Sequence, residues 1–150
     1  MIIKGLVCMI IFLDIDGVLN YADLKERSPL GYIGISDDKM ILLKELVDKT
    51  SAKIVLISSW LRELRNNTAD GEYLLEKFNR FNLTFEQMDG RDKWQGIQKW
   101  LSIYPTDDWY IIDDEIDLWC SDFKNIKEHC ILTSFSDGLV DVENIVKGRF

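Results

Sequence analysis

The sequence is poor in histidine, in paired cysteines and in positive charge, and each shortage excludes a class of function. His129 is the only histidine, which excludes mechanisms that need a histidine base together with histidine metal ligands. Cys8, Cys120 and Cys130 form no CxxC pair and are odd in number, as expected for reduced thiols in a cytoplasmic protein. The net charge of −8 argues against a broad nucleic-acid-binding surface.

Long apolar runs are also missing, so we expect no membrane-spanning segment. The most apolar stretch, residues 7–13, is too short to cross a bilayer and has no small-residue cleavage site before the acids that follow. A buried strand is the better interpretation, with Cys8 in the core. A length of 150 residues and a hydrophobic content of 47% predict one domain, residues 1–150, with its own core.

What is present is an alternation of strand-like and helix-like segments. Strands are expected at residues 7–13, 53–57, 84–88, 109–112 and 130–132. Helices are expected after a cap at Ser36, at 72–81, at 94–103 and around 142–146, with a polar break at 66–71. Residues 17–35 contain glycines and a proline and are expected to form a loop with room for a short hairpin. This order predicts an α/β fold with a mainly parallel sheet.

Polar residues directly follow three of the predicted strands. They are Asp14 and Asp16, Ser58 and Ser59, and Asp113 and Asp114. Ligands of open α/β sheets bind beyond the carboxyl ends of the strands, so we expect these side chains to share one site. Four carboxylates gathered there cannot all stay ionised without a cation, and an oxygen-rich site suits Mg²⁺. Lys93, just before a predicted helix, can add a positive charge.

These residue types fit phosphoryl transfer. One carboxylate can act as a nucleophile and form an aspartyl-phosphate, while a metal and a lysine neutralise the phosphate oxygens. A second carboxylate can protonate the leaving oxygen and then activate water. Because residues i and i+2 of a strand share a face, Asp14 and Asp16 are both expected to reach one reacting group.

Four segments, in this order, resemble the motifs of phosphatases of the haloacid dehalogenase (HAD) superfamily: IIFLDIDGVL, KIVLISS, RDKWQGIQKWL and YIIDD. Within it, the SSW tripeptide, the lysine-led helix and the late DGLVDVENI most resemble the HAD domain of multi-domain ("Swiss army knife") RNA-repair proteins. The resemblance implies a Rossmann-like three-layer α/β/α sandwich. The 41 residues between Asp16 and Ser58 leave no room for a large cap domain, since a helix and a strand use about half of them.

The resemblance also implies roles for individual residues. Asp14 would be the nucleophile and Asp16 the general acid and base. Ser58 would bind the transferred phosphoryl group, with Ser59 as the competing choice, and Lys93 would steady its charge.

The implied cofactor is Mg²⁺. Asp114 would be its main side-chain ligand, supported by Asp113, with Asp14 and the backbone carbonyl of Asp16 completing the protein ligands. Gly17 and Arg62 are further candidates for substrate binding.

The implied substrate is a phosphomonoester, and the resemblance does not specify the molecule that carries the phosphate. An uncapped site suits a polynucleotide end or a phosphoprotein, and also small phosphoesters or nucleotides. Two alternatives to a phosphatase are a receiver-like signalling domain and a catalytically silent phosphate-binding module. A receiver has a lone central aspartate and a lysine after its last strand, whereas Lys93 here precedes Asp113 and Asp114.

Overall fold

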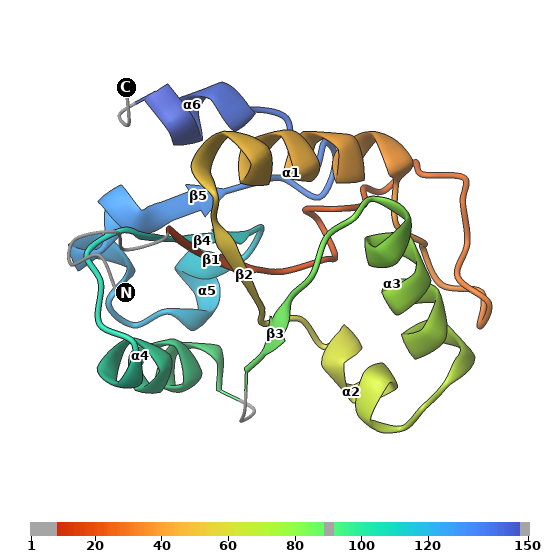
Figure 1. Ribbon diagram of the computed structural model, residues 1–150, viewed down its shortest axis with the longest axis horizontal. Helices are drawn as coiled ribbons and strands as arrows, with labels where there is room; N and C mark the ends of the chain where they lie inside the picture. The colour runs from red at the N-terminus through yellow and green to blue at the C-terminus, as the bar shows by residue number, and fades with distance from the viewer. Residues whose placement is uncertain (1–8, 89–91, 148–150) are drawn as a thin grey trace, which may run out of the picture.

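A five-stranded parallel sheet forms the centre of the protein, as a computed structural model that describes residues 9–88 and 92–147 shows (Figure 1). The strand order is β3-β2-β1-β4-β5 and every pairing is parallel. The strands are β1 (Ile10–Leu13), β2 (Lys53–Leu56), β3 (Glu86–Gln87), β4 (Trp109–Asp113) and β5 (Cys130–Leu132). All five predicted strands are present. Residues 7 and 8 of the first one, including Cys8, lie outside the described residues.

Helices cover both faces of this sheet (Figure 1). They are α1 (Asp37–Thr50), α2 (Trp60–Arg65), α3 (Ala69–Arg80), α4 (Lys93–Ile103), α5 (Ile116–Trp119) and α6 (Val142–Val146), with 3₁₀ turns at Phe123–Asn125 and Lys127–His129. In Figure 1, α1 and α6 lie above the sheet, α4 and α5 lie below it, and α2 and α3 lie beyond β3. The predicted three-layer α/β/α sandwich is confirmed.

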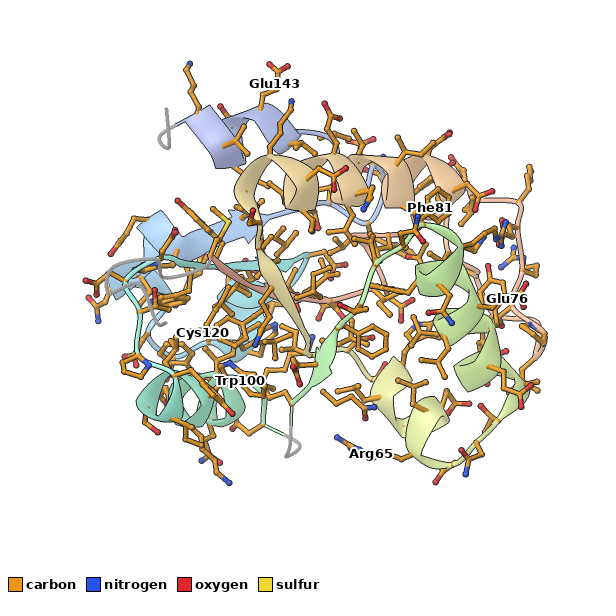
Figure 2. All side chains as sticks on the ribbon, viewed as in Figure 1. Arg65, Glu76, Phe81, Trp100, Cys120 and Glu143 are labelled. Atoms are coloured by element: carbon orange, nitrogen blue, oxygen red, sulfur yellow. The ribbon has the colours of Figure 1, made fainter. Side chains whose placement is uncertain are left out.

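The central strand β1 is buried on both sides and separates two cores. Ile11 and Leu13 belong to the core that α1, α3 and α6 cover. Ile10 and Phe12 point the other way, into a core between the sheet and helices α4 and α5; this core includes Cys120, and Trp100 packs against it (Figure 2). The continuous apolar sequence of this strand follows from that placement, because each successive side chain meets a different layer of helices.

The register of the three middle strands brings their carboxyl ends to one level. Leu13 pairs with Leu56 on one side and with Ile112 on the other. Asp14, Ile57 and Asp113 are therefore the next residues along these strands. The polar groups that follow the strands start from the same edge of the sheet.

The region between β2 and β3 differs from the prediction. Helix α3 begins at Ala69, where the Thr68 side chain accepts a hydrogen bond from the Gly71 N–H, so Gly71 is helical although it was placed in a polar break. Its lack of a side chain has a packing reason, since a Cβ at residue 71 would lie 2.5 Å from the Glu63 carbonyl oxygen. This contact lets α2 and α3 cross closely. Arg65 then ties α2 to the end of β3 by donating to the Met88 carbonyl at 3.0 Å (Figure 2).

The long segment between β1 and α1 forms no separate domain within the described residues. Its one pairing is an antiparallel bridge between Arg27 and Ile33, which confirms the short hairpin. Ser36 ends the segment as the predicted cap of α1, accepting from the Lys39 N–H at 3.3 Å. Among the helices that the structure describes, none has the length and apolarity needed to cross a membrane.

Candidate active site

A cleft of about 760 Å³ opens at the carboxyl ends of β1, β2 and β4. Sixteen residues line it: Asp14, Asp16, Leu30, Tyr32, Ile33, Ser59, Trp60, Arg62, Glu63, Asp70, Lys93, Asp113, Asp114, Glu115, Trp119 and Phe135. The floor is charged and the rim is partly apolar. Almost all of the residues predicted from the sequence to share a site are therefore brought together.

Three carboxylates form the floor of the cleft. One oxygen from each of Asp14, Asp113 and Asp114 lies within 4.8 Å of one from each of the others. Lys93, the first residue of α4, places its Nζ 2.7 Å from Asp113 Oδ2 and 3.6 Å from Asp14 Oδ2. One ammonium against three carboxylates leaves an excess of negative charge in a largely buried position.

The two acids at the end of β4 have different surroundings. Asp113 is fully buried, and both of its oxygens are engaged, Oδ1 by the Glu115 N–H at 2.7 Å and Oδ2 by Lys93. Asp114 is only half-buried and packs against Gly17, where any Cβ would overlap its carboxylate. Gly17 has a φ of +78°, so both its conformation and its contact require glycine. Asp114 is thus the more available ligand, and Asp113 holds Lys93.

The pKa values of Asp14, Asp114 and Lys93 on the floor of the cleft all depart from their usual values. Burial raises the pKa of Asp14 to about 7 against the lowering influence of Lys93, and Asp113 adds to the rise. Burial, and then the Asp113 charge, also raises the pKa of Asp114. Burial opposes the charge of Lys93, but Asp14 and Asp113 outweigh it, so its pKa lies above the usual value.

This donor set fits a divalent cation. Three hard carboxylate oxygen ligands lie close enough to share one ion, and Mg²⁺ prefers a few carboxylates with water and substrate oxygens completing its shell. Burial, and then the Asp113 charge, raise the pKa of Asp14 even beside Lys93, and a bound cation would favour its ionised form. The side chains that could bind the cation are those of Asp14, Asp113 and Asp114.

Asp16 lies apart from this three-acid group. The strand ends at Leu13 and residues 15–19 form a turn, so the strand alternation that was expected to place Asp16 beside Asp14 does not apply. Asp16 is exposed in the cleft, and its Oδ1 accepts hydrogen bonds from Asn20 Nδ2 at 2.9 Å and Trp60 Nε1 at 3.2 Å. The turn thus separates a buried acid from an exposed one.

The two serines after β2 also differ. Ser59 is among the residues that line the cleft, whereas Ser58 is buried and its Oγ accepts from the Trp60 N–H at 3.1 Å. Arg62 reaches the cleft from α2 with a mostly exposed side chain, 3.7 Å from Glu63. The arginine is therefore free to move toward a bound anion, while Ser58 shapes the turn that leads into α2.

An apolar hairpin forms one rim of the cleft. Leu30 and Tyr32 lie in the segment closed by the bridge between Arg27 and Ile33, and their exposed fractions are 53% and 68%. Asp70 of α3 anchors this hairpin, because its carboxylate accepts from Ser28 Oγ at 2.8 Å and from the Leu30 N–H at 2.9 Å.

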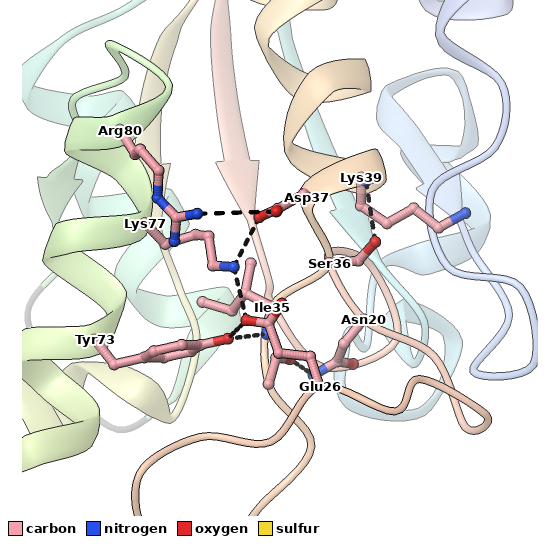
Figure 3. Close-up of polar contacts among 10 residues, drawn as sticks. Asn20, Glu26, Ile35, Ser36, Asp37, Lys39, Tyr73, Lys77 and Arg80 are labelled. Atoms are coloured by element: carbon pink, nitrogen blue, oxygen red, sulfur yellow. Dashed lines mark hydrogen bonds and ion pairs between the residues drawn. The ribbon is translucent and has the colours of Figure 1, made fainter.

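A second anchor holds the same segment deeper in the fold (Figure 3). Lys77 of α3 is fully buried and lies 2.7 Å from Glu26 and 2.8 Å from Asp37 at the start of α1. Tyr73 hydrogen-bonds to Glu26 and accepts from the Ile35 N–H at 2.9 Å. Together the two anchors fasten the loop that follows Asp14 and Asp16 (the DxD motif) to α3.

Sequence reasoning missed Asn20, Asp70, and the hydrogen bond from Trp60 to Asp16. A local signal existed for Asn20 alone, since it follows Asp16 by four residues within the turn. Trp60 is buried, and its indole N–H donates a hydrogen bond to Asp16 in the cleft. Asp70 contacts residues 40 and 42 positions away, which no local pattern reveals.

Comparisons with known proteins agree with this architecture. A chain of a solved structure titled "Structure of Pnkp1/Rnl/Hen1 complex" is similar with a TM-score of 0.50 and 13% identity, over 90% of this chain and 48% of that one. The present chain thus spans about half the length of that neighbour, and the likeness concerns the fold. No curated protein matches its sequence. The model of the family described as "HAD domain in Swiss Army Knife RNA repair proteins" matches residues 10–143, so the chain belongs to this family.

Proposed function

We propose that this protein is a Mg²⁺-dependent phosphatase that hydrolyses phosphomonoesters through an aspartyl-phosphate on Asp14. The observation that carries the proposal is the cluster of Asp14, Asp113 and Asp114 beside Lys93 on the floor of an open cleft. Membership of a HAD family supports a phosphoesterase-type activity.

In the first step, a carboxylate oxygen of Asp14 attacks the phosphorus atom and the bond from phosphorus to the leaving oxygen breaks. Asp16, exposed in the same cleft, donates a proton to that leaving oxygen. In the second step, Asp16 takes a proton from a water molecule, which attacks the phosphorus and releases inorganic phosphate and free Asp14. The buried acid thus acts as the nucleophile and the exposed acid moves the proton.

The remaining residues stabilise charge. Asp14 and Asp114, with Asp113 beside them, would hold Mg²⁺, which supplies neutralisation of the phosphate oxygens. Lys93 is held by Asp113 and adds a fixed positive charge next to the nucleophile. Ser58 or Ser59, together with backbone N–H groups after β2, would bind other phosphate oxygens, and Arg62 would contact the substrate at the rim.

We further propose that the phosphate is carried by the end of an RNA strand. The family is named for RNA-repair proteins. The cleft is uncapped among the described residues, which admits a large substrate. Leu30, Tyr32 and Phe135 on its rim offer apolar and aromatic surface to a terminal base.

The decisive experiment is release of inorganic phosphate from 4-nitrophenyl phosphate with Mg²⁺ and with EDTA. We expect Mg²⁺-dependent release that Asp14→Asn abolishes. Asp38→Asn is the matched control, because Asp38 is an exposed acid in the first turn of α1, outside the cleft. Absence of activity would refute the phosphatase and favour a silent phosphate-binding module. Activity that survives Asp14→Asn would refute the aspartyl-phosphate on Asp14.

A second experiment compares molecules that carry the phosphate on different groups. Oligoribonucleotides with a 3′-phosphate or a 5′-phosphate should have a higher kcat/KM than the corresponding mononucleotides and a phosphopeptide. Equal values for all of them would refute the RNA-end proposal while leaving the phosphatase intact.

A further inference from the structure

The exposed acid of the DxD motif is held on one side only. Asp16 Oδ1 accepts two N–H hydrogen bonds, one from Asn20 Nδ2 at 2.9 Å and one from Trp60 Nε1 at 3.2 Å. Among the described residues, the hydrogen bonds of this carboxylate all go to Oδ1, and Oδ2 receives none. A carboxyl group whose one oxygen accepts two N–H hydrogen bonds has the other oxygen available to exchange a proton with a bound molecule.

Asn20 is positioned by the turn and by the loop that follows it. It is fully buried, its Oδ1 accepts from the Gly17 N–H at 2.8 Å, and its Nδ2 also donates to the Gly34 carbonyl at 3.0 Å. The amide orientation is therefore set by one acceptor and one donor contact besides Asp16. The Nδ2 group cannot turn away from Asp16 without breaking them.

Trp60 is positioned by α3 and by the anchored loop. Its side chain is buried, and its ring lies 6.2 Å from the ring of Tyr73, tilted by 31°. Tyr73 is itself fixed by Glu26 and the Ile35 N–H, beside the buried Lys77 (Figure 3). The indole N–H thus reaches Asp16 from a rigid part of the fold, 44 residues away in sequence.

We propose that Trp60 and Asn20 are positioning residues that hold Asp16 with Oδ2 free for proton transfer to the leaving oxygen. The inference rests on the proposed phosphatase function and adds two residues to it. Neither contacts the reacting atoms. Their effect reaches the reaction through the orientation of one carboxylate, so it should appear only where proton donation limits the rate.

Substrates with different leaving groups separate this role from a general structural one. 4-Nitrophenol leaves readily without a proton, whereas the alcohol of an alkyl phosphate does not. Trp60→Phe keeps an aromatic ring and removes the N–H donor. We expect kcat/KM of Trp60→Phe to fall by about 10-fold or more for the alkyl phosphate, since general acid catalysis contributes roughly 10²–10⁴-fold, and to stay nearly unchanged for 4-nitrophenyl phosphate. The ratio kcat/KM reports the first, phosphoryl-transfer step.

Trp100→Phe is the matched control. It makes the same chemical change on α4, at an indole whose buried Nε1 has no hydrogen-bond partner among residues 9–88 and 92–147, and should leave both values unchanged. Replacing Trp60 with its benzothiophene isostere removes the N–H at nearly constant shape and gives the same test if Trp60→Phe does not fold.

Three outcomes overturn the inference. An equal loss on both substrates means that Trp60 acts through folding or binding, and no loss on either means that its N–H is dispensable. Inactivity of the unchanged protein on both substrates refutes the proposed function as well, and is recognised because it appears before any substitution is made.

Discussion

Replacing Asp14 with asparagine should stabilise the metal-free protein while it abolishes the proposed activity. Asp14 is 7% exposed and shares its surroundings with Asp113 and Asp114. Burial, against Lys93 and with Asp113, raises its pKa from 3.8 to about 7. The ionised carboxylate is therefore less favourable in the folded protein than in the unfolded chain.

The magnitude follows from the size of that shift. Each unit of pKa difference corresponds to about 1.4 kcal/mol, so about three units amount to roughly 4 kcal/mol of destabilisation at pH 8, above both pKa values. Because the folded pKa is the higher one, wild-type stability is complete below pH 4 and is lost as the pH rises through 7. We expect Asp14→Asn to recover about 2 to 4 kcal/mol at pH 8, or about 5–15 °C in melting temperature.

The assay is urea unfolding in EDTA, followed by tryptophan fluorescence, at pH 8 and at lower pH. The stability difference between Asp14→Asn and wild type should be largest at pH 8 and should shrink toward pH 4. Asp38→Asn again serves as the control. It should be neutral or slightly destabilising, because a negative charge at residue 38 interacts favourably with the N-terminus of α1. A variant no more stable than wild type at pH 8 would refute the electrostatic reasoning.

Three further predictions test other parts of the site. Asp114→Asn should raise the Mg²⁺ concentration for half-maximal phosphate release about 10-fold, if the lost ligand is worth about 1.4 kcal/mol; an unchanged Mg²⁺ titration would contradict Asp114 as a ligand. Lys77→Met should lower the free energy of unfolding by about 1–2 kcal/mol, less than the 3–5 typical of fully buried pairs, because Glu26 and Asp37 are 36% and 50% exposed and can rehydrate; thermal unfolding with an unchanged midpoint would contradict this. Asp70→Asn weakens the anchor of the rim hairpin and should raise KM for a phosphorylated oligonucleotide several-fold more than KM for 4-nitrophenyl phosphate; equal changes would exclude a role for the hairpin in binding the substrate body.

The floor of the cleft was predictable because a parallel sheet brings distant motifs to one edge. Asp14 and Asp113 each end an apolar strand, and the pairing of Leu13 with Ile112 makes them neighbours. Lys93 was predictable from its place at the start of a helix, and it does contact both acids. For these residues, the local sequence motif and the strand topology predict the same position.

The short helices, and the contacts that position the site residues, were harder to predict from the sequence. Helices α2 and α5 have six and four residues, too few for a helical period to show in the sequence. The separation of Asp16 from the acid cluster depends on a turn that begins right after Leu13. Both acids line the same cleft as predicted, but a turn and not strand alternation places Asp16 there, because β1 ends at Leu13.

The sequence by itself determined the order of the strands and of the helices other than α2 and α5, and the identity of the charged residues at the strand ends, since these follow from apolar periodicity and from local motifs. Only the tertiary structure decided which of those residues are buried, which are accessible and which hydrogen bonds they form. It buries Asp14 and Asp113 around Lys93, leaves Asp114 accessible beside Gly17, and turns one oxygen of Asp16 toward Asn20 and Trp60. Burial and hydrogen-bond direction depend on contacts between segments far apart in the chain, and no local pattern of residues encodes them.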